Sequence, residues 1–116
     1  MTITIYHNTA CGTSRSTLAL IREAGHEPLI VDYVKNPLQR AALQRMIAQA
    51  GLTPRAAMRD KGDVYDELGL ADASLSDQAL LDAMMAHPIL INRPFVVTDK
   101  GVRLCRPADL VREILP

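Results

Sequence analysis

The first 33 residues carry an order of predicted elements that few folds can accommodate. Thr2–Tyr6 alternates polar and apolar side chains, which predicts a strand. A helix is predicted from about residue 13 or 14 to residue 24, and Gly25 is suited to end it. Leu29–Tyr33 is apolar enough to predict a second strand that is buried on both faces. A strand, a helix and a strand within about thirty residues form a βαβ unit with parallel strands.

The middle of the chain predicts helices only. Asn36-Pro37 and Thr53-Pro54 each place a capping side chain before a proline, the pattern of a helix start. Ser76 caps a further helix, which runs to about residue 86. We therefore expect a helical insertion at about residues 37–86.

The last third of the chain returns to strands. Phe95–Thr98 and Val102–Cys105 are predicted strands joined by a compact hairpin, and Pro107 opens a final helix. The complete order is βαβ, a helical insertion, then ββα. This order predicts an α/β protein with a thioredoxin-like fold, a mixed four-stranded sheet and one domain over residues 1–116.

Composition excludes several classes of protein. The chain has 116 residues, is 48% hydrophobic, and balances 13 Lys and Arg against 13 Asp and Glu. This length is sufficient for a core without a partner, so we expect a monomer. Zero net charge gives no reason to expect nucleic-acid binding. No apolar run is long enough for a membrane span, and no secretion signal is visible, so the expected compartment is the cytoplasm.

Cys11 lies between a predicted strand end and a predicted helix start. Backbone N–H groups and the helix dipole there favour the thiolate, although a small buried cysteine is an alternative interpretation. In the motif C-x-x-S, Ser14 stands where a dithiol protein has its second cysteine, so a second thiol must come from another molecule. We expect Cys105 to be a buried structural cysteine rather than a resolving one. No residues have zinc-site spacing, so no metal site is expected.

The basic residues are ten arginines and only three lysines. Arginine grips oxyanions with a planar fork, although each arginine alone is also explained as a surface ion-pair partner. A phosphatase-type loop would need arginine six residues after the cysteine, where this chain has Thr17. Other candidate arginines lie at predicted element ends, at Arg59, Arg93 and Arg106. In a thioredoxin-like fold a cis-proline lies beside the active cysteine, and Pro94 in that place would bring Arg93 there.

Three motifs together resemble one known family. They are Tyr6–Arg15 (YHNTACGTSR), His87–Pro94 (HPILINRP) and Arg103–Pro107 (RLCRP). In this order they closely resemble the glutaredoxin-dependent arsenate reductases, and the similarity covers nearly the whole chain. The resemblance implies a thioredoxin-like fold that contains this helical insertion.

The resemblance also implies a role for each matching residue. Cys11 would be the nucleophile, and His7 and Ser14 would tune its thiolate, although a structural role for His7 is an equal alternative. Arsenate would be bound by three arginines: Arg59, Arg93 and Arg106. The implied reaction forms a Cys11–arsenate adduct, with glutathione as co-substrate, glutaredoxin as protein partner and no bound cofactor.

One position departs from the family pattern. The family commonly has proline where this chain has Thr9, which adds backbone freedom before the cysteine. Two other functions stay open at this point: a related glutathione-dependent thiol oxidoreductase, and a redox regulator that binds RNA polymerase. Such regulators typically carry a C-x-x-C switch, which Ser14 removes.

Overall fold

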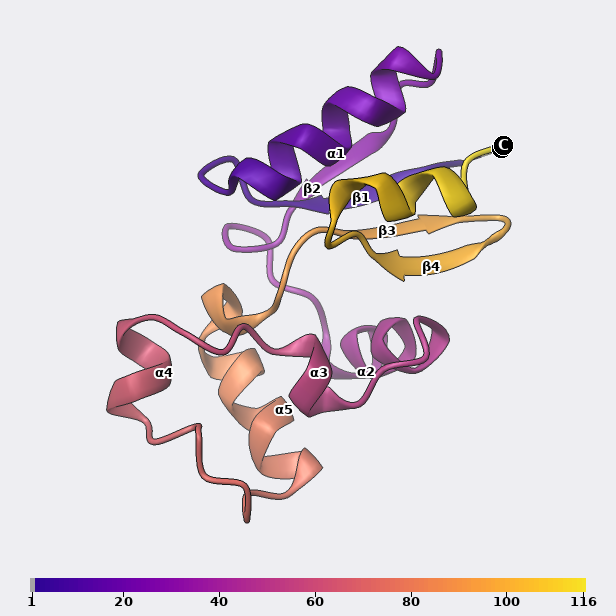
Figure 1. Cartoon of the computed structure of the whole chain (residues 1–116). Helices are drawn as coiled ribbons and strands as arrows, with labels where there is room; N and C mark the ends of the chain where they lie inside the picture. The colour runs from indigo at the N-terminus through magenta and orange to yellow at the C-terminus, as the bar shows by residue number, and fades with distance from the viewer. Residues whose placement is uncertain (1) are drawn as a thin grey trace. The chain divides into compact units, whose positions relative to one another are not determined.

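The chain divides into two compact units that alternate along the sequence. In the computed structural model, residues 2–116 are described. The first unit contains the residues up to Asn36 and those from Arg93 onward, and the second contains Pro37–Asn92 (Figure 1). The helical insertion predicted at about residues 37–86 is therefore a compact unit that continues to residue 92.

The first unit is built on a mixed four-stranded sheet. Its strands are β1 (Thr4–His7), β2 (Leu29–Asp32), β3 (Phe95–Thr98) and β4 (Gly101–Leu104). Their spatial order is β2-β1-β3-β4. β1 pairs in parallel with β2, whereas β3 is antiparallel to both β1 and β4. This topology confirms the predicted thioredoxin-like sheet.

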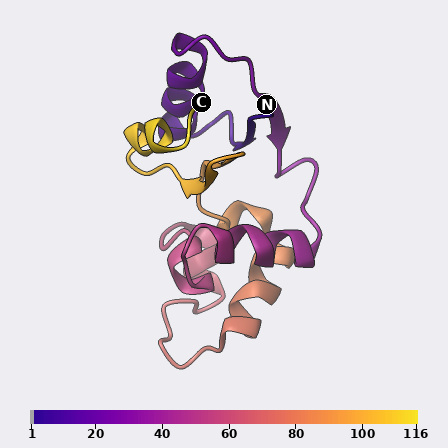
Figure 2. The same cartoon turned by 90° about the vertical axis from the view of Figure 1, so that its right-hand side faces the viewer.

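Two helices cover one face of this sheet. The α-helix α1 (Gly12–Glu23) and the 3-10 helix η2 (Ala108–Glu113) contact each other and lie side by side on that face (Figures 1 and 2). The core beneath them consists of Ile3, Ile5, Ile21, Val96, Cys105, Val111 and Ile114. Thr98 Oγ1 donates a 2.6 Å hydrogen bond to the carbonyl of Ile114, which fixes the end of the chain to β3. Burial of each large aliphatic side chain contributes roughly 1.5–3 kcal/mol, so this layer holds the sheet and helices together.

The predicted burial of the second strand is wrong. Leu29 is 60% exposed and Ile30 is 39% exposed. The reason is that β2 is the outermost strand, next to β1 only. An apolar run indicates a strand, but it does not distinguish a central strand from an edge strand.

The second unit is helical, as predicted. Its elements are α2 (Arg40–Gln49), α3 (Pro54–Ala57), α4 (Asp63–Glu67), α5 (Asp77–Ala86) and the 3-10 turn η1 (Pro88–Leu90). The predicted caps of α3 and α5 are confirmed. The hydroxyl of Thr53 accepts from the N–H of Ala56, and that of Ser76 accepts from the N–H of Ala79.

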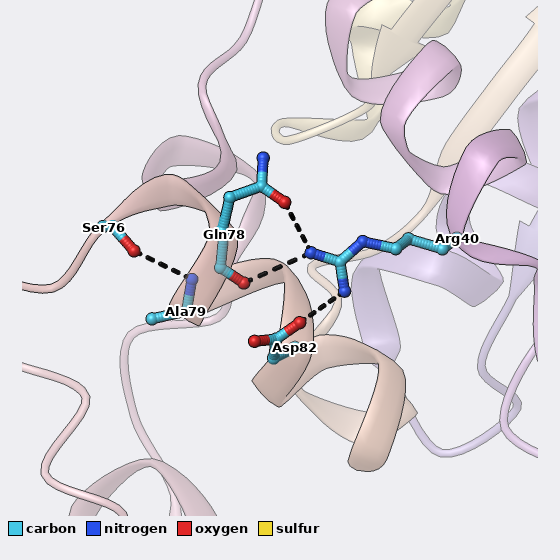
Figure 3. A network of polar contacts seen from close by, with 5 residues as sticks. All are labelled: Arg40, Ser76, Gln78, Ala79 and Asp82. Carbon is cyan, nitrogen blue, oxygen red and sulfur yellow. Dashed lines mark hydrogen bonds and ion pairs between the residues drawn. The ribbon is translucent and has the colours of Figure 1, made fainter.

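Arg40 connects the first and last long helices of this unit. Its guanidinium donates to the side-chain oxygen of Gln78 at 2.7 Å and to the carboxylate of Asp82 at 2.5 Å (Figure 3). These contacts lie at the surface, so they orient α2 against α5 more than they stabilise it. The apolar core supplies the stability: Leu43, Met46, Ile47, Leu80, Leu81 and Met84 are all buried.

The predicted helix start at Asn36-Pro37 is wrong, because α2 begins at Arg40. The carboxylate of Asp32 accepts from the N–H groups of Val34 and Lys35, both at 3.2 Å. The N–H of Asn36 donates to the carbonyl of Asp32 at 2.8 Å. Asn36 therefore closes a turn that Asp32 organises, instead of capping a helix.

Candidate active site

Cys11 occupies the position predicted for a reactive thiol. It follows β1, and it is the N-cap residue of α1, with extended backbone angles (φ −96°, ψ 122°). Its N–H donates to the carbonyl of Asn8 at 3.0 Å, and its side chain is half-buried. The first N–H groups of α1 have no partner within the helix, so they are free to face the sulfur.

The ladder between β3 and β4 explains why two distant arginines meet. Phe95 lies opposite Leu104, and the N–H of Cys105 donates to the carbonyl of Pro94 at 2.9 Å. Two residues before Phe95 is Arg93, and two residues after Leu104 is Arg106. The same register therefore places these two arginines opposite each other, beyond the regular strands.

Both arginines reach Cys11. Arg106 Nη1 lies 3.8 Å from the sulfur of Cys11, and it also donates to the carbonyl of Arg93 at 2.9 Å. The side chain of Arg93 hydrogen-bonds the same sulfur and is only 6% exposed. The peptide bond between Arg93 and Pro94 is cis, as expected for this fold, and so is the bond between Arg106 and Pro107. The thiol and two guanidinium groups thus form one cluster.

These neighbours make Cys11 acidic. Burial of the thiol raises its pKa, but the backbone N–H of Ser14 and the side chains of Arg93 and Arg106 lower it more. The resulting pKa of Cys11 is about 7, against an ordinary 9.0. A substantial fraction of the sulfur is therefore thiolate at neutral pH.

His7 and Ser14 contact each other rather than the sulfur through their side chains. Ser14 Oγ lies 2.5 Å from His7 Nδ1, and it accepts from the N–H of Asn8 at 3.1 Å. Burial lowers the pKa of His7, and it outweighs the opposing effect of Asp32. His7 is therefore neutral at neutral pH, with the Ser14 hydroxyl suited to donate to its Nδ1. The hydrogen bond from Ser14 that favours the thiolate comes from its backbone.

Arg59 lies in the second unit. It is half-buried, and its N–H donates to the carbonyl of Leu90 at 2.7 Å. An isolated β-bridge between Met58 and Ile91 holds this segment. The cluster described above contains residues of the first unit only, so a role for Arg59 in oxyanion binding stays a prediction.

Cys105 is buried, as predicted. Its residue is 0% exposed, and burial raises its pKa to about 12. Its sulfur lies 3.7 Å from the carbonyl of Arg103. A neutral, enclosed thiol of this kind packs as a small apolar group and does not act as a nucleophile.

Two residues that hold the Cys11 loop were not singled out from the sequence. Asn8 is 7% exposed, and its side-chain oxygen accepts from the N–H of Ala10 at 2.9 Å. Arg15 Nη1 donates to the carbonyl of Thr9 at 2.8 Å. An asparagine two residues before an N–H donor is a recognised turn signal, which could have indicated the first contact. The second contact has no such signal.

The described residues contain neither a metal-ligand cluster nor a membrane-spanning helix. Among residues 2–116, no group of three or more His, Cys, Asp and Glu side chains could hold a metal ion. No helix in this described range is both long enough and apolar enough to cross a bilayer.

Comparison with known proteins identifies the family. The model of the ArsC family matches residues 6–114, which include every residue of the Cys11 cluster. The chain belongs to the ArsC family.

Curated members of the ArsC family are close in sequence. An arsenate reductase of Rhizobium meliloti (strain 1021) is 66% identical over 116 residues, which are all of this chain and 83% of the relative. An arsenate reductase of Escherichia coli (strain K12) is 54% identical over 98% of this chain and 81% of the relative.

Solved structures of ArsC relatives confirm the fold. An arsenate reductase from Vibrio cholerae superimposes with a TM-score of 0.93 at 45% identity, and the match covers 99% of this chain and 98% of that one. The thioredoxin-like fold and the family resemblance inferred from the three motifs are both confirmed.

Proposed function

We propose that this protein is an arsenate reductase that uses glutathione and glutaredoxin. The observation that carries the proposal is the contact between the Cys11 sulfur and the guanidinium groups of Arg93 and Arg106, with the pKa of Cys11 at about 7. The family match and the names of close relatives support arsenate as the substrate. The reductants rest on the motif resemblance.

The arginines suit an oxyanion that must approach a negatively charged sulfur. Arsenate and a thiolate repel each other in water, and two fixed cations beside the sulfur offset that repulsion. Arg93 is buried, so its charge is poorly screened by solvent. Arg59 is proposed as a third ligand of the oxyanion.

The reaction begins with attack by the Cys11 thiolate on As(V). A sulfur–arsenic bond forms, and one arsenate oxygen leaves as water after it takes a proton. A glutathione thiolate then forms a disulfide with Cys11 while the sulfur–arsenic bond breaks. The electron pair of that bond stays on arsenic, so As(V) becomes As(III) and two thiols become one disulfide.

The second thiol has to come from outside the chain. Ser14 occupies the local position, and its hydroxyl contacts His7 and Asn8. Cys105 is enclosed in the core and strongly resistant to ionisation. Glutathione therefore serves as co-substrate, and glutaredoxin reduces the mixed disulfide left on Cys11. The proposal places a monomer without a bound cofactor in the cytoplasm.

An assay of arsenate-dependent NADPH consumption tests the proposal. We expect NADPH consumption with glutathione, glutaredoxin and glutathione reductase present, and little consumption when glutaredoxin is omitted. An equal rate with thioredoxin and thioredoxin reductase in their place would overturn the choice of reductant. No arsenate-dependent rate with either system would overturn the proposed substrate.

A second candidate function is a related glutathione-dependent thiol oxidoreductase. The low pKa of Cys11 supports this activity as well as arsenate reduction. The same coupled assay separates the two activities when a glutathione mixed disulfide replaces arsenate. We expect arsenate to give the higher kcat/KM, because the paired guanidinium groups suit a compact oxyanion. A higher value for the mixed disulfide would favour the alternative.

A further inference from the structure

The loop between β1 and α1 is held by two side chains that the proposed chemistry does not use. The Asn8 side-chain oxygen accepts from the N–H of Ala10 at 2.9 Å, and the Asn8 carbonyl accepts from the N–H of Cys11 at 3.0 Å. The N–H of Asn8 is bonded in turn to the Ser14 hydroxyl at 3.1 Å. Three polar groups of one buried residue therefore fix the backbone that carries the nucleophile.

Arg15, which is exposed, hydrogen-bonds the same loop. Its Nη1 donates to the carbonyl of Thr9 at 2.8 Å, and its Nη2 lies 3.8 Å from the place where a side chain on Gly12 would begin. Within residues 2–116, no carboxylate forms an ion pair with Arg15. In this range its guanidinium therefore makes one side-chain hydrogen bond, to the loop carbonyl of Thr9.

Thr9 has the fewest restraints of its own among the residues of this loop. It is exposed, and its N–H has no hydrogen-bond partner among the described residues. A proline at this position would fix the φ angle, whereas threonine leaves φ free to vary. Among residues 2–116, the hydrogen bond from Arg15 is the only one to the Thr9 carbonyl, and the Asn8 side chain holds the Ala10 N–H of the same peptide.

We propose that Asn8 and Arg15 are positioning residues that clasp the loop of residues 8–11 and so hold the Cys11 sulfur against Arg93 and Arg106. This assignment rests on the proposed function for its activity readout. Its geometric readout, the reactivity of the Cys11 thiol, needs no arsenate. The clasp acts through the backbone of the loop, because neither side chain donates a hydrogen bond to the sulfur.

The test uses Arg15→Gln, since Arg15 is exposed and its loss leaves no buried group unpaired. A loosened loop lowers the fraction of molecules in which the sulfur meets its donors. We expect kcat for arsenate to fall about tenfold and the KM for arsenate to change less than about twofold. The rate of iodoacetamide alkylation at pH 7 should fall about fivefold, as the pKa of Cys11 moves toward its ordinary value.

Arg22→Gln is the matched control for charge. Arg22 lies on the same helix and pairs with Glu27 at the surface, so the substitution removes one positive charge without touching the loop. We expect the kcat and the alkylation rate of Arg22→Gln to stay near those of the natural protein. Equal behaviour of Arg15→Gln and Arg22→Gln would overturn the proposal.

Rescue by proline separates positioning from other roles of Arg15. Thr9→Pro stiffens the same turn and removes no hydrogen bond. In the Arg15→Gln background it should restore most of the lost kcat and alkylation rate. Failure of this rescue contradicts the clasp, as does a rise in the KM for arsenate at unchanged kcat, which would make Arg15 a substrate ligand. If the natural protein has no arsenate activity, the proposed function fails, while the alkylation rates still decide the clasp.

Discussion

The two cysteines of the first unit show how little burial alone says about a thiol. Loss of solvent is the largest effect on both, and it raises the pKa in both cases. At Cys105, which lies in the apolar core, burial outweighs the opposing charge of Arg103, and the pKa rises to about 12. At Cys11 the Ser14 N–H and two guanidinium groups reverse the effect, and the pKa falls to about 7. Hydrogen-bond donors, rather than exposure, distinguish the nucleophile from the core residue.

The largest expected effect is the difference in arsenate reduction between serine substitutions of the two cysteines. Cys11→Ser should lower arsenate reduction at least about a thousandfold, because a hydroxyl in that place is neither ionised nor oxidisable to a disulfide. Cys105→Ser should keep most of the kcat in the coupled assay. It should lower the free energy of unfolding by about 1–3 kcal/mol, since it buries a hydroxyl. Substantial activity in Cys11→Ser would refute the assignment of the nucleophile.

Removal of either arginine donor should move the pKa of Cys11 upward, in the direction of the pKa of Cys105. Arg93→Ala and Arg106→Ala are each expected to lower kcat/KM for arsenate by about ten- to a thousandfold, or roughly 1.5–4 kcal/mol. Each should also raise the pKa of Cys11 in a thiolate absorbance titration. Arg103→Ala is the control, because Arg103 pairs at the surface with Glu113 on η2. An effect of Arg103→Ala as large as the other two would contradict the cluster.

The pH dependence of alkylation should differ between the two thiols. The rate at Cys11 should rise about tenfold per pH unit below pH 7 and level off above it, since the thiolate is the reacting form. Cys105 should stay unmodified until the protein unfolds. Mass spectrometry of peptides after timed iodoacetamide treatment measures both. Early modification of Cys105 in the folded protein would show that its burial is wrong.

The smallest expected effects are on stability, and they have opposite signs. The pKa of Cys11 is lower when folded than when unfolded, so its ionisation adds stability as pH rises from about 7 to 9. The pKa of Cys105 is higher when folded, so its contribution is lost as pH rises from 9 toward 12. Urea unfolding of the natural protein, Cys11→Ser and Cys105→Ala at several pH values measures both slopes. Slopes of the same sign for the two thiols would contradict the comparison.

Much of this arrangement could be predicted from local sequence. Caps such as Thr53 and Ser76 act within four residues, and the structure places them where the sequence does. The position of Cys11 at the start of α1 also follows from local pattern. The start at Asn36 was wrong, because Asp32 competes for the same backbone groups. The sequence alone does not show whether the Asp32 turn or the Asn36 helix start will form, because both use the same stretch of backbone.

The arginine contacts depend on strand register, which local pattern does not determine. Arg93 and Arg106 meet because Phe95 lies opposite Leu104, and the sequence indicates two strands without fixing that register. Their positions at predicted strand ends and the expected cis-proline already made them candidates, and the family resemblance implied the same two residues. The contact from Arg15 to the Thr9 carbonyl was missed, since a long exposed side chain offers no spacing rule toward a loop carbonyl.

The exposed edge of β2 bears on how the protein behaves when concentrated. Leu29 and Ile30 are partly exposed, beside a row of backbone groups that no strand pairs with in the described chain. An open apolar edge is a template on which further copies can stack into fibres. Here the turn organised by Asp32 ends the strand after four residues, and a short edge strand is one way in which proteins limit such stacking. We therefore expect variants that lengthen this strand to precipitate more readily than the natural protein when concentrated.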